Sequence, residues 1–147
     1  PTSANGAEQE PIDGMPTVEL ADNGEPTITV PSDFAAPDTT EIAVLKKGDG
    51  PVVESGDTVF VQYTGVLPDG TVFDSSWQRG APTQFQTTGV VQGFQKALEG
   101  QTVGSQVIAV IPASEGYGDA AQGSIPANSP LIFVVDILGV QRAAAQQ

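Results

Sequence analysis

Tyr117 is the side chain whose surroundings point most clearly to a ligand. It stands between Gly116 and Gly118 within residues 112–130, a stretch that also holds three prolines. A connection of this length in a compact domain is usually a binding or active-site element. A tyrosine between two glycines in such a loop is also hard to explain as a core residue. We therefore expect Tyr117 to contact a ligand.

The chain of 147 residues contains no histidine and no cysteine, which restricts its chemistry. Without imidazole or thiol groups, the sequence excludes Ser-His and Cys-His nucleophilic catalysis, zinc sites with imidazole or thiolate ligands, and disulfide redox chemistry. A hydrolase is also disfavoured, because no two carboxylates share a motif that would supply an acid and a base. We therefore expect any reaction of this protein to be a mild one that uses none of these groups.

Asp74 and the remaining aromatic residues each have two interpretations. Asp74 precedes two serines, as turn and capping residues do, so it serves the turn, a site, or both. Trp77 follows the serines and is expected in a loop at the edge of a cleft. By residue type alone, the aromatic side chains would be assigned to the core; they include Tyr63, Phe73, Phe94 and Phe133.

The acidic residues are concentrated at the N-terminal end. Residues 1–41 contain nine of the 18 carboxylates and no lysine or arginine, whereas residues 42–147 hold the other nine and all five basic residues. Because a polyanion requires a basic footprint, we expect neither nucleic acid nor an anionic membrane surface as a partner. The acidic segment is expected to be solubilising, with a calcium or partner site as the alternative.

Short strands and turns dominate the expected secondary structure. Glycine and proline make up 29 of the 147 residues, which favours turns over long helices. The hydrophobic pattern predicts one helix, at 90–99, and places Asp69-Gly70 at a hairpin turn. The run at 131–140 is almost continuously apolar and is expected inside the sheet. The predicted strands are 41–45, 58–64, 83–86, 105–111 and 131–140, which together with the helix form an α+β domain.

The first 39 residues are expected to be an extension of this domain. Residues 1–15 have no hydrophobic period and are predicted to be disordered. Alternating runs at 17–20 and 27–30 flank Asn23-Gly24 and predict a hairpin, which must dock on another element or fray. Because residue 1 is proline, we expect that preceding sequence has been removed. We see no signal-peptide pattern and no apolar run long enough for a membrane span.

Ordered motifs in residues 40–140 resemble the FKBP family, the FK506-binding prolyl isomerases. The resemblance is carried first by 61–70 (VQYTGVLPDG) and 73–76 (FDSS). It continues in the same order through 90–94 (VVQGF), 104–106 (GSQ), Ile111-Pro112 with Tyr117-Gly118, and Ile125-Pro126 with 131–133 (LIF).

The resemblance implies a twisted antiparallel β-sheet wrapped around one short α-helix, with an apolar cleft between them. It divides the chain into an acidic extension (1–39), an isomerase domain (40–141) and a flexible tail (142–147). The backbone N–H of Val91 and the hydroxyl of Tyr117 would bind ligand carbonyls. The implied catalytic residues are Tyr63, Asp74, Phe94, Tyr117 and Phe133, and the implied substrate-binding residues are Phe73, Phe85, Val90, Val91 and Ile125.

The same resemblance implies a monomeric peptidyl-prolyl cis-trans isomerase that needs no metal or cofactor. Its partners would be proline-containing polypeptides, with FK506 or rapamycin as inhibitors. A binding or chaperone module with the same fold and little turnover is the alternative. The sequence departs from the family at Phe94, where the best-known members have tryptophan, and at Gly89, which replaces a frequent glutamate. The acidic extension and lack of cysteine favour an extracytoplasmic location, with the cytoplasm as the alternative.

Overall fold

The computed structural model describes residues 7–8, 16–21, 24–31, 34–120 and 125–141. The expectations for the rest of 1–15, for the tip of the Tyr117 loop at 121–124 and for the tail at 142–147 lie outside these residues. Within the described ranges, no helix has the length and apolarity of a membrane span.

A seven-stranded antiparallel sheet forms the body of the domain. Its main path runs in the order β1-β4-β8-β9-β5-β6, and β7 pairs with the other end of β5. Each predicted strand is confirmed to within two residues, and β9 lies inside the sheet as expected. The strands are β1 Ala7–Glu8, β4 Glu41–Lys47, β5 Thr58–Val66, β6 Val72–Ser75, β7 Thr83–Gln86, β8 Gln106–Ile111 and β9 Leu131–Gln141.

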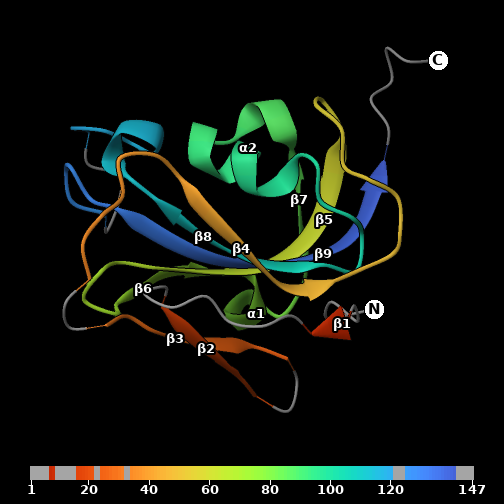
Figure 1. Ribbon diagram of the computed structural model, residues 1–147, viewed down its shortest axis with the longest axis horizontal. Coiled ribbons are helices and arrows are strands. Elements are labelled where there is room, and N and C mark those ends of the chain that lie inside the picture. The colour runs from red at the N-terminus through yellow and green to blue at the C-terminus, as the bar shows by residue number, and fades with distance from the viewer. Residues whose placement is uncertain (1–6, 9–15, 22–23, 32–33, 121–124, 142–147) are drawn as a thin grey trace.

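Helix α2 (Gln92–Leu98) packs across one face of the sheet, above it in Figure 1. It is shorter than the predicted 90–99, because Val90 and Val91 are extended and the helix begins only after them. Gly93 brings the helix close to the sheet: a Cβ atom there would lie 2.5 Å from Cγ2 of Ile111. The α2 side of the sheet therefore carries the main core, including Val61, Val107, Val135 and Ile137.

The opposite face of the sheet is also apolar. Successive side chains of a strand point to opposite faces, so the apolar runs of β8 and β9 supply both. On this outer face Ile108, Val110, Ile132 and Val134 are fully or almost fully buried. They belong to a second cluster with Ile28, and Val18, Val30, Phe34 and Leu45 pack against it.

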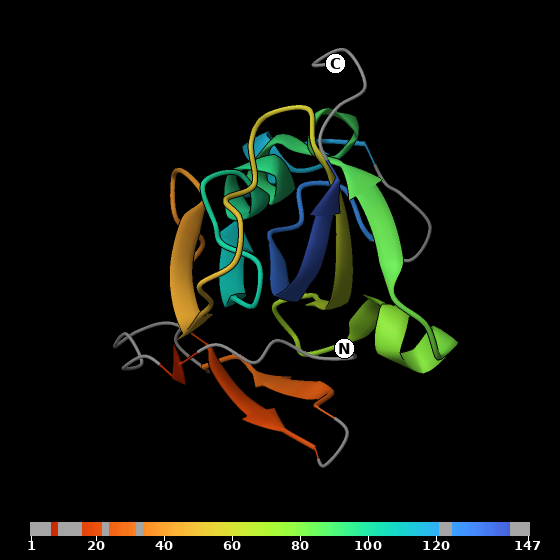
Figure 2. The same ribbon diagram turned by 90° about the vertical axis from the view of Figure 1, so that its right-hand side faces the viewer.

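A hairpin from the N-terminal extension covers this outer face. β2 (Thr17–Leu20) pairs with β3 (Pro26–Thr29) over the region where the sequence predicts a hairpin. Figures 1 and 2 both place it on the side of the sheet opposite α2. The domain thus has three layers: helix, sheet and hairpin. β1 differs from the disorder expected for residues 1–15, because its Ala7 and Glu8 pair with Lys47 and Lys46 of β4.

A second short helix, α1 (Ser76–Arg79), contains Trp77. The expectation that Trp77 lies in a loop was therefore wrong. The Ser75 hydroxyl accepts the N–H of Gln78, and Gly80 ends the turn at a φ of 83°. A helix of one turn gives almost no periodic signal, so only these two caps could have revealed it. The strand at 83–86 is confirmed, and the 3₁₀ turns η1 (Thr87–Gly89) and η2 (Ala113–Glu115) complete the elements.

Candidate active site

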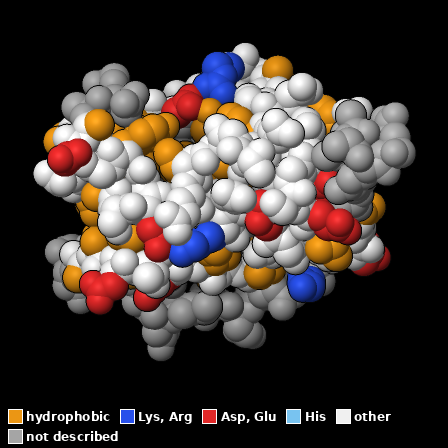
Figure 3. All heavy atoms as spheres, turned by 90° about the horizontal axis from the view of Figure 1, so that it is seen from above, with side chains coloured by type: hydrophobic (Ala, Val, Ile, Leu, Met, Phe, Trp, Pro, Cys, Tyr) orange, Lys and Arg blue, Asp and Glu red, His pale blue; other side chains and the backbone are white. Residues whose placement is uncertain are grey.

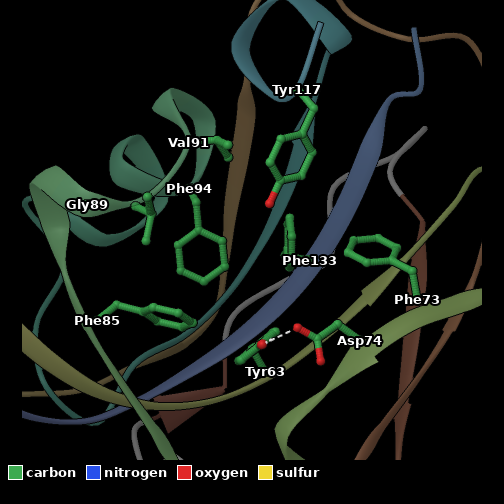
Figure 4. A pocket seen from close by; sticks show the side chains of 10 residues that line it. Tyr63, Phe73, Asp74, Phe85, Gly89, Val91, Phe94, Tyr117 and Phe133 are labelled. Atoms are coloured by element: carbon green, nitrogen blue, oxygen red, sulfur yellow. Dashed lines mark hydrogen bonds between the residues drawn. The ribbon is translucent and has the colours of Figure 1, made fainter. Parts of the chain in front are cut away.

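A pocket of about 270 Å³ opens between α2 and the sheet. Figure 4 shows its side chains converging from strands, turns and helix. On the face above α2, Figure 3 shows hydrophobic side chains concentrated at the upper left and scattered elsewhere, while the basic side chains stand apart from one another. The lining residues are Tyr63, Phe73, Asp74, Phe85, Gly89, Val90, Val91, Phe94, Tyr117 and Phe133.

Phe94 forms the floor of the pocket. It is 4% exposed, and its ring centroid lies 4.8 Å from that of Phe133 and 5.4 Å from that of Phe85. The ring of Tyr63 meets it at 89° with centroids 6.0 Å apart. Such edge-to-face pairs each contribute about 0.5–1.5 kcal/mol beyond the burial of area. The floor is therefore a rigid aromatic surface with no polar group of its own.

Gly65 allows two wall residues to pack over strand β5. A Cβ atom at this position would lie 2.6 Å from the ring of Phe73 and 2.7 Å from the ring of Phe133. These two rings meet nearly at right angles with centroids 5.4 Å apart. In the sequence, Gly65 is one residue of the 61–70 motif; the structure gives it a steric role in shaping the pocket.

Tyr63, Asp74 and Arg79 form a polar cluster at the rim. The Tyr63 phenol donates to one oxygen of Asp74 (Figure 4), and an Arg79 nitrogen donates to the other. A second Arg79 nitrogen lies 3.1 Å from the Tyr63 hydroxyl. Burial raises the pKa of Tyr63, and its hydrogen bond to Asp74 raises it further. At neutral pH the phenol is thus a protonated donor held in one orientation.

A buried network fixes this cluster to the sheet. The Ser76 hydroxyl accepts the N–H of Tyr63 at 2.7 Å and donates to the side-chain oxygen of Gln62, also at 2.7 Å. The run Asp74-Ser75-Ser76 therefore combines the two roles considered for it. Asp74 binds Tyr63 and Arg79 at the site, while the serines build the turn that positions them.

Two hydrogen-bond donors remain available at the pocket. Tyr117 is 40% exposed, and Figure 4 shows its ring reaching over the pocket with the hydroxyl directed inward. Among the described residues, neither this hydroxyl nor the backbone N–H of Val91 has a hydrogen-bond partner. An apolar ligand with carbonyl groups would satisfy both donors.

The structure brings nine of the ten expected site residues together. Ile125 is the exception: it is 7% exposed and packs in the main core, and it does not line the pocket. Two residues of the site were not predicted. The only signal for Arg79 was its position five residues after Asp74. Gly89 was noted only as a departure from the glutamate frequent in the family. Trp77 was expected at the cleft edge. It lies instead in α1, outside the lining, and its indole nitrogen is buried without a partner among the described residues.

An antiparallel sheet wrapped around a short helix, with an aromatic pocket between them, defines a class of proteins. Comparison of the chain with known protein families identifies this class. A family model described as FKBP-type peptidyl-prolyl cis-trans isomerase matches residues 50–138. The chain belongs to this family, as the resemblance predicted.

Individual relatives agree with this assignment. An FK506-binding protein of Streptomyces anulatus is 42% identical over 122 residues, which cover 80% of this chain and 90% of that protein. A probable FKBP-type peptidyl-prolyl cis-trans isomerase of Haemophilus influenzae is 44% identical over 107 residues, or 69% of this chain. This chain spans less than half of the Haemophilus protein, 44% of its length. The crystal structure of FkpA from Escherichia coli superposes with a TM-score of 0.68 at 33% identity, covering 86% of this chain and 52% of that one.

Proposed function

We propose that this protein is a peptidyl-prolyl cis-trans isomerase that binds X–Pro segments in the aromatic pocket and accelerates rotation about the X–Pro bond. The observation that carries the proposal is an apolar floor, Phe94, beneath the inward-directed Tyr117 hydroxyl, with the backbone N–H of Val91 as a second donor in the lining. The chain also belongs to a family described by this activity.

The reaction requires no proton transfer and no covalent intermediate. Amide resonance gives a peptide bond a rotation barrier of about 18–20 kcal/mol. In the twisted transition state this resonance is lost, so the carbonyl is less polar than in the planar ground state. An apolar pocket therefore stabilises the twisted form relative to the planar one, and this differential binding lowers the barrier.

The polar groups hold the substrate while its bond rotates. The Tyr117 hydroxyl and the Val91 N–H bind backbone carbonyls, and the prolyl ring rests on Phe94. The Tyr63 phenol, fixed by Asp74 and Arg79, closes one side of the pocket. A rate increase of a thousandfold to a millionfold needs about 4–8 kcal/mol, which a few such effects can supply.

The test is the relaxation rate of a peptide enriched in its cis-proline form, measured with and without the protein. We expect a clear acceleration by the wild type and a reduced one by Tyr117→Phe and Phe94→Ala. A wild-type protein that binds the peptide but leaves its relaxation rate unchanged would instead support the alternative, a peptide-binding or chaperone module.

The proposal extends to the partners, the oligomeric state and the location of the protein. FK506 or rapamycin occupies the pocket and competes with proline-containing polypeptides, which calorimetric titration tests. The protein acts as a monomer, which sedimentation equilibrium tests.

The protein acts outside the cytoplasm, a location favoured by its acidic N-terminal segment and its lack of cysteine. Fractionation of the source cells tests this location.

A further inference from the structure

Glu115 occupies a junction of three elements beside the pocket. It is the last residue of η2 and lies two residues before Tyr117. Its side chain is only 11% exposed, although it carries a carboxylate. A partly buried carboxylate is stabilised by hydrogen-bond and charged partners, and Glu115 has them on two sides.

One partner is Lys96 of helix α2. Its ammonium nitrogen lies 2.9 Å from each carboxylate oxygen. Lys96 is two residues after Phe94, the floor of the pocket. The ion pair therefore ties the start of the Tyr117 loop to the helix that carries the pocket floor.

The other partner is Thr40, immediately before β4. Its backbone N–H and its hydroxyl both donate to one oxygen of Glu115, at 2.9 Å and 2.6 Å. Gly93 makes room for this contact, since a Cβ atom there would lie 2.7 Å from the Thr40 hydroxyl oxygen. Thr40 ends the segment that begins at Phe34 on the outer face of the sheet. In Figure 1 this segment, in orange, rises along the edge of the domain from the hairpin layer to the helix layer.

Tyr117 itself has few anchors. Its side chain is 40% exposed, and its hydroxyl has no partner among the described residues. The Gly116 and Gly118 N–H groups both donate to the Ala113 carbonyl, at 3.0 Å and 2.8 Å, and glycines leave the backbone between them easily deformed. The Asn128 N–H also donates to the Gly118 carbonyl at 2.8 Å, on the far side of Tyr117. On the near side, the position of the Tyr117 ring depends on what holds η2 in place.

We propose that Glu115 is a positioning residue for Tyr117, and that through Thr40 the N-terminal segment helps to set where the Tyr117 hydroxyl meets the substrate. Lys96 anchors the carboxylate to the pocket floor, and Thr40 anchors it to the extension. This inference rests on the proposed isomerase function. It makes the segment before β4 a part of the working site.

The experiment combines kinetics with NMR of the two tyrosines of the chain, Tyr63 and Tyr117. In Glu115→Gln and Lys96→Met we expect kcat/KM for a proline peptide to fall about tenfold, since a misplaced group can cost up to about a hundredfold. The Tyr117 ring signal should shift or broaden while that of Tyr63 stays in place. Glu99→Gln is the matched control: Glu99 follows α2 and accepts a bond from Gln95 at 2.7 Å. It should leave rate and spectrum unchanged.

A double mutant separates positioning from a general structural effect. If Glu115 acts through the Tyr117 hydroxyl, Glu115→Gln should cause little further loss of kcat/KM in a Tyr117→Phe background. An equal loss in both backgrounds would overturn the inference, as would an unchanged Tyr117 signal in both single variants. Should the wild type not accelerate isomerisation, the proposed function fails. The Tyr117 signal and peptide affinity then still decide the inference by the same criteria. If Glu115→Gln does not fold, Lys96→Met, which leaves both Thr40 bonds in place, provides the same tests.

Discussion

Tyr63 and Asp74 are joined at the rim of the pocket by a hydrogen bond from the phenol to the carboxylate, and Arg79 holds the other carboxylate oxygen. Although Asp74 is 40% exposed and Arg79 47% exposed, the phenol between them faces the apolar cavity. The cluster therefore spans the boundary between solvent and pocket. It keeps Tyr63 neutral and oriented, with the Asp74 carboxylate at the rim of the pocket.

This geometry makes the ionisation of Tyr63 sensitive to Asp74. Burial and the bond to Asp74 both raise the pKa of Tyr63 above its ordinary value of 10.0. In Asp74→Asn the negative charge is removed, so the pKa should fall below that of the wild type while burial still opposes ionisation. NMR titration of labelled tyrosine measures it, and Tyr63→Phe assigns the signal. A pKa equal to that of the wild type would show that the bond is not formed in solution.

Phe94 should matter to the site beyond its contribution to stability. Phe94→Ala is expected to cost about 3–5 kcal/mol of unfolding free energy and most of the peptide affinity. Leu98→Ala is the matched control, because Leu98 lies on the same helix, is fully buried and does not line the pocket. It should lose about 2–5 kcal/mol while retaining affinity in the folded fraction. Equal losses of affinity in the two variants would contradict the role of Phe94 as the floor.

A single methyl group at Gly65 should disturb the pocket wall. Gly65→Ala places a carbon within 3 Å of the rings of Phe73 and Phe133. We expect a loss of about 1–3 kcal/mol of unfolding free energy, as in overpacked cores, together with weaker peptide binding. In Gly89→Ala, by contrast, the added carbon meets nothing within 4 Å. That variant should keep its unfolding free energy. Denaturant unfolding compares the two, and a harmless Gly65→Ala would refute the steric role.

The hairpin should stabilise the whole domain. Ile28 is 8% exposed and packs in the cluster on the outer face of the sheet. Ile28→Ala should cost about 2–5 kcal/mol, since it removes buried methyl groups from the contact between hairpin and sheet. Thr27→Ala, on the exposed side of the same strand, should be nearly neutral. Denaturant unfolding measures both. A neutral Ile28→Ala would mean that the hairpin does not dock stably.

Glu115 should make the unfolding free energy depend on pH in the acidic range. Its hydrogen bonds from Thr40 and its contact with Lys96 lower its pKa from 4.5 to about 2. A lowered pKa stabilises the fold above the value of the unfolded chain, and the stabilisation disappears as the pH falls through the folded-state value. The wild type should therefore lose stability between pH 4.5 and 2. Glu115→Gln should flatten the unfolding free energy across this interval, and an unchanged slope would contradict the contact.

Local sequence patterns were sufficient to predict most of the sheet. Val59, Val61 and Tyr63 stand at every second position and lie on the α2 side, as period two predicts. The pattern failed where an element is too short to show a period, as in α1. It also failed at the start of α2, where Val90 and Val91 fit the apolar spacing of a helix but adopt extended conformations.

The site was predictable where a motif fixes the residue type, and less so where the partner is distant in sequence. Tyr117 and Phe94 were identified from their motifs, although they contribute to one cavity only through the tertiary fold. The bonds between Thr40 and Glu115 join residues 75 positions apart. No local pattern predicts such a contact. The same holds for the docking of the hairpin, because the alternation in 17–30 shows that it has an apolar face but not which surface covers it.

The central claim is that the pocket stabilises a rotated X–Pro bond more than a planar one. The direct measurement compares the affinities of two short ligands that differ only at this bond, one with an ordinary planar prolyl amide and one with a fixed, twisted surrogate. We predict that the twisted ligand binds at least about a hundredfold more tightly, as analogues of a transition state do. We also predict that Phe94→Ala removes most of this difference. Equal affinities in the wild type would contradict the account.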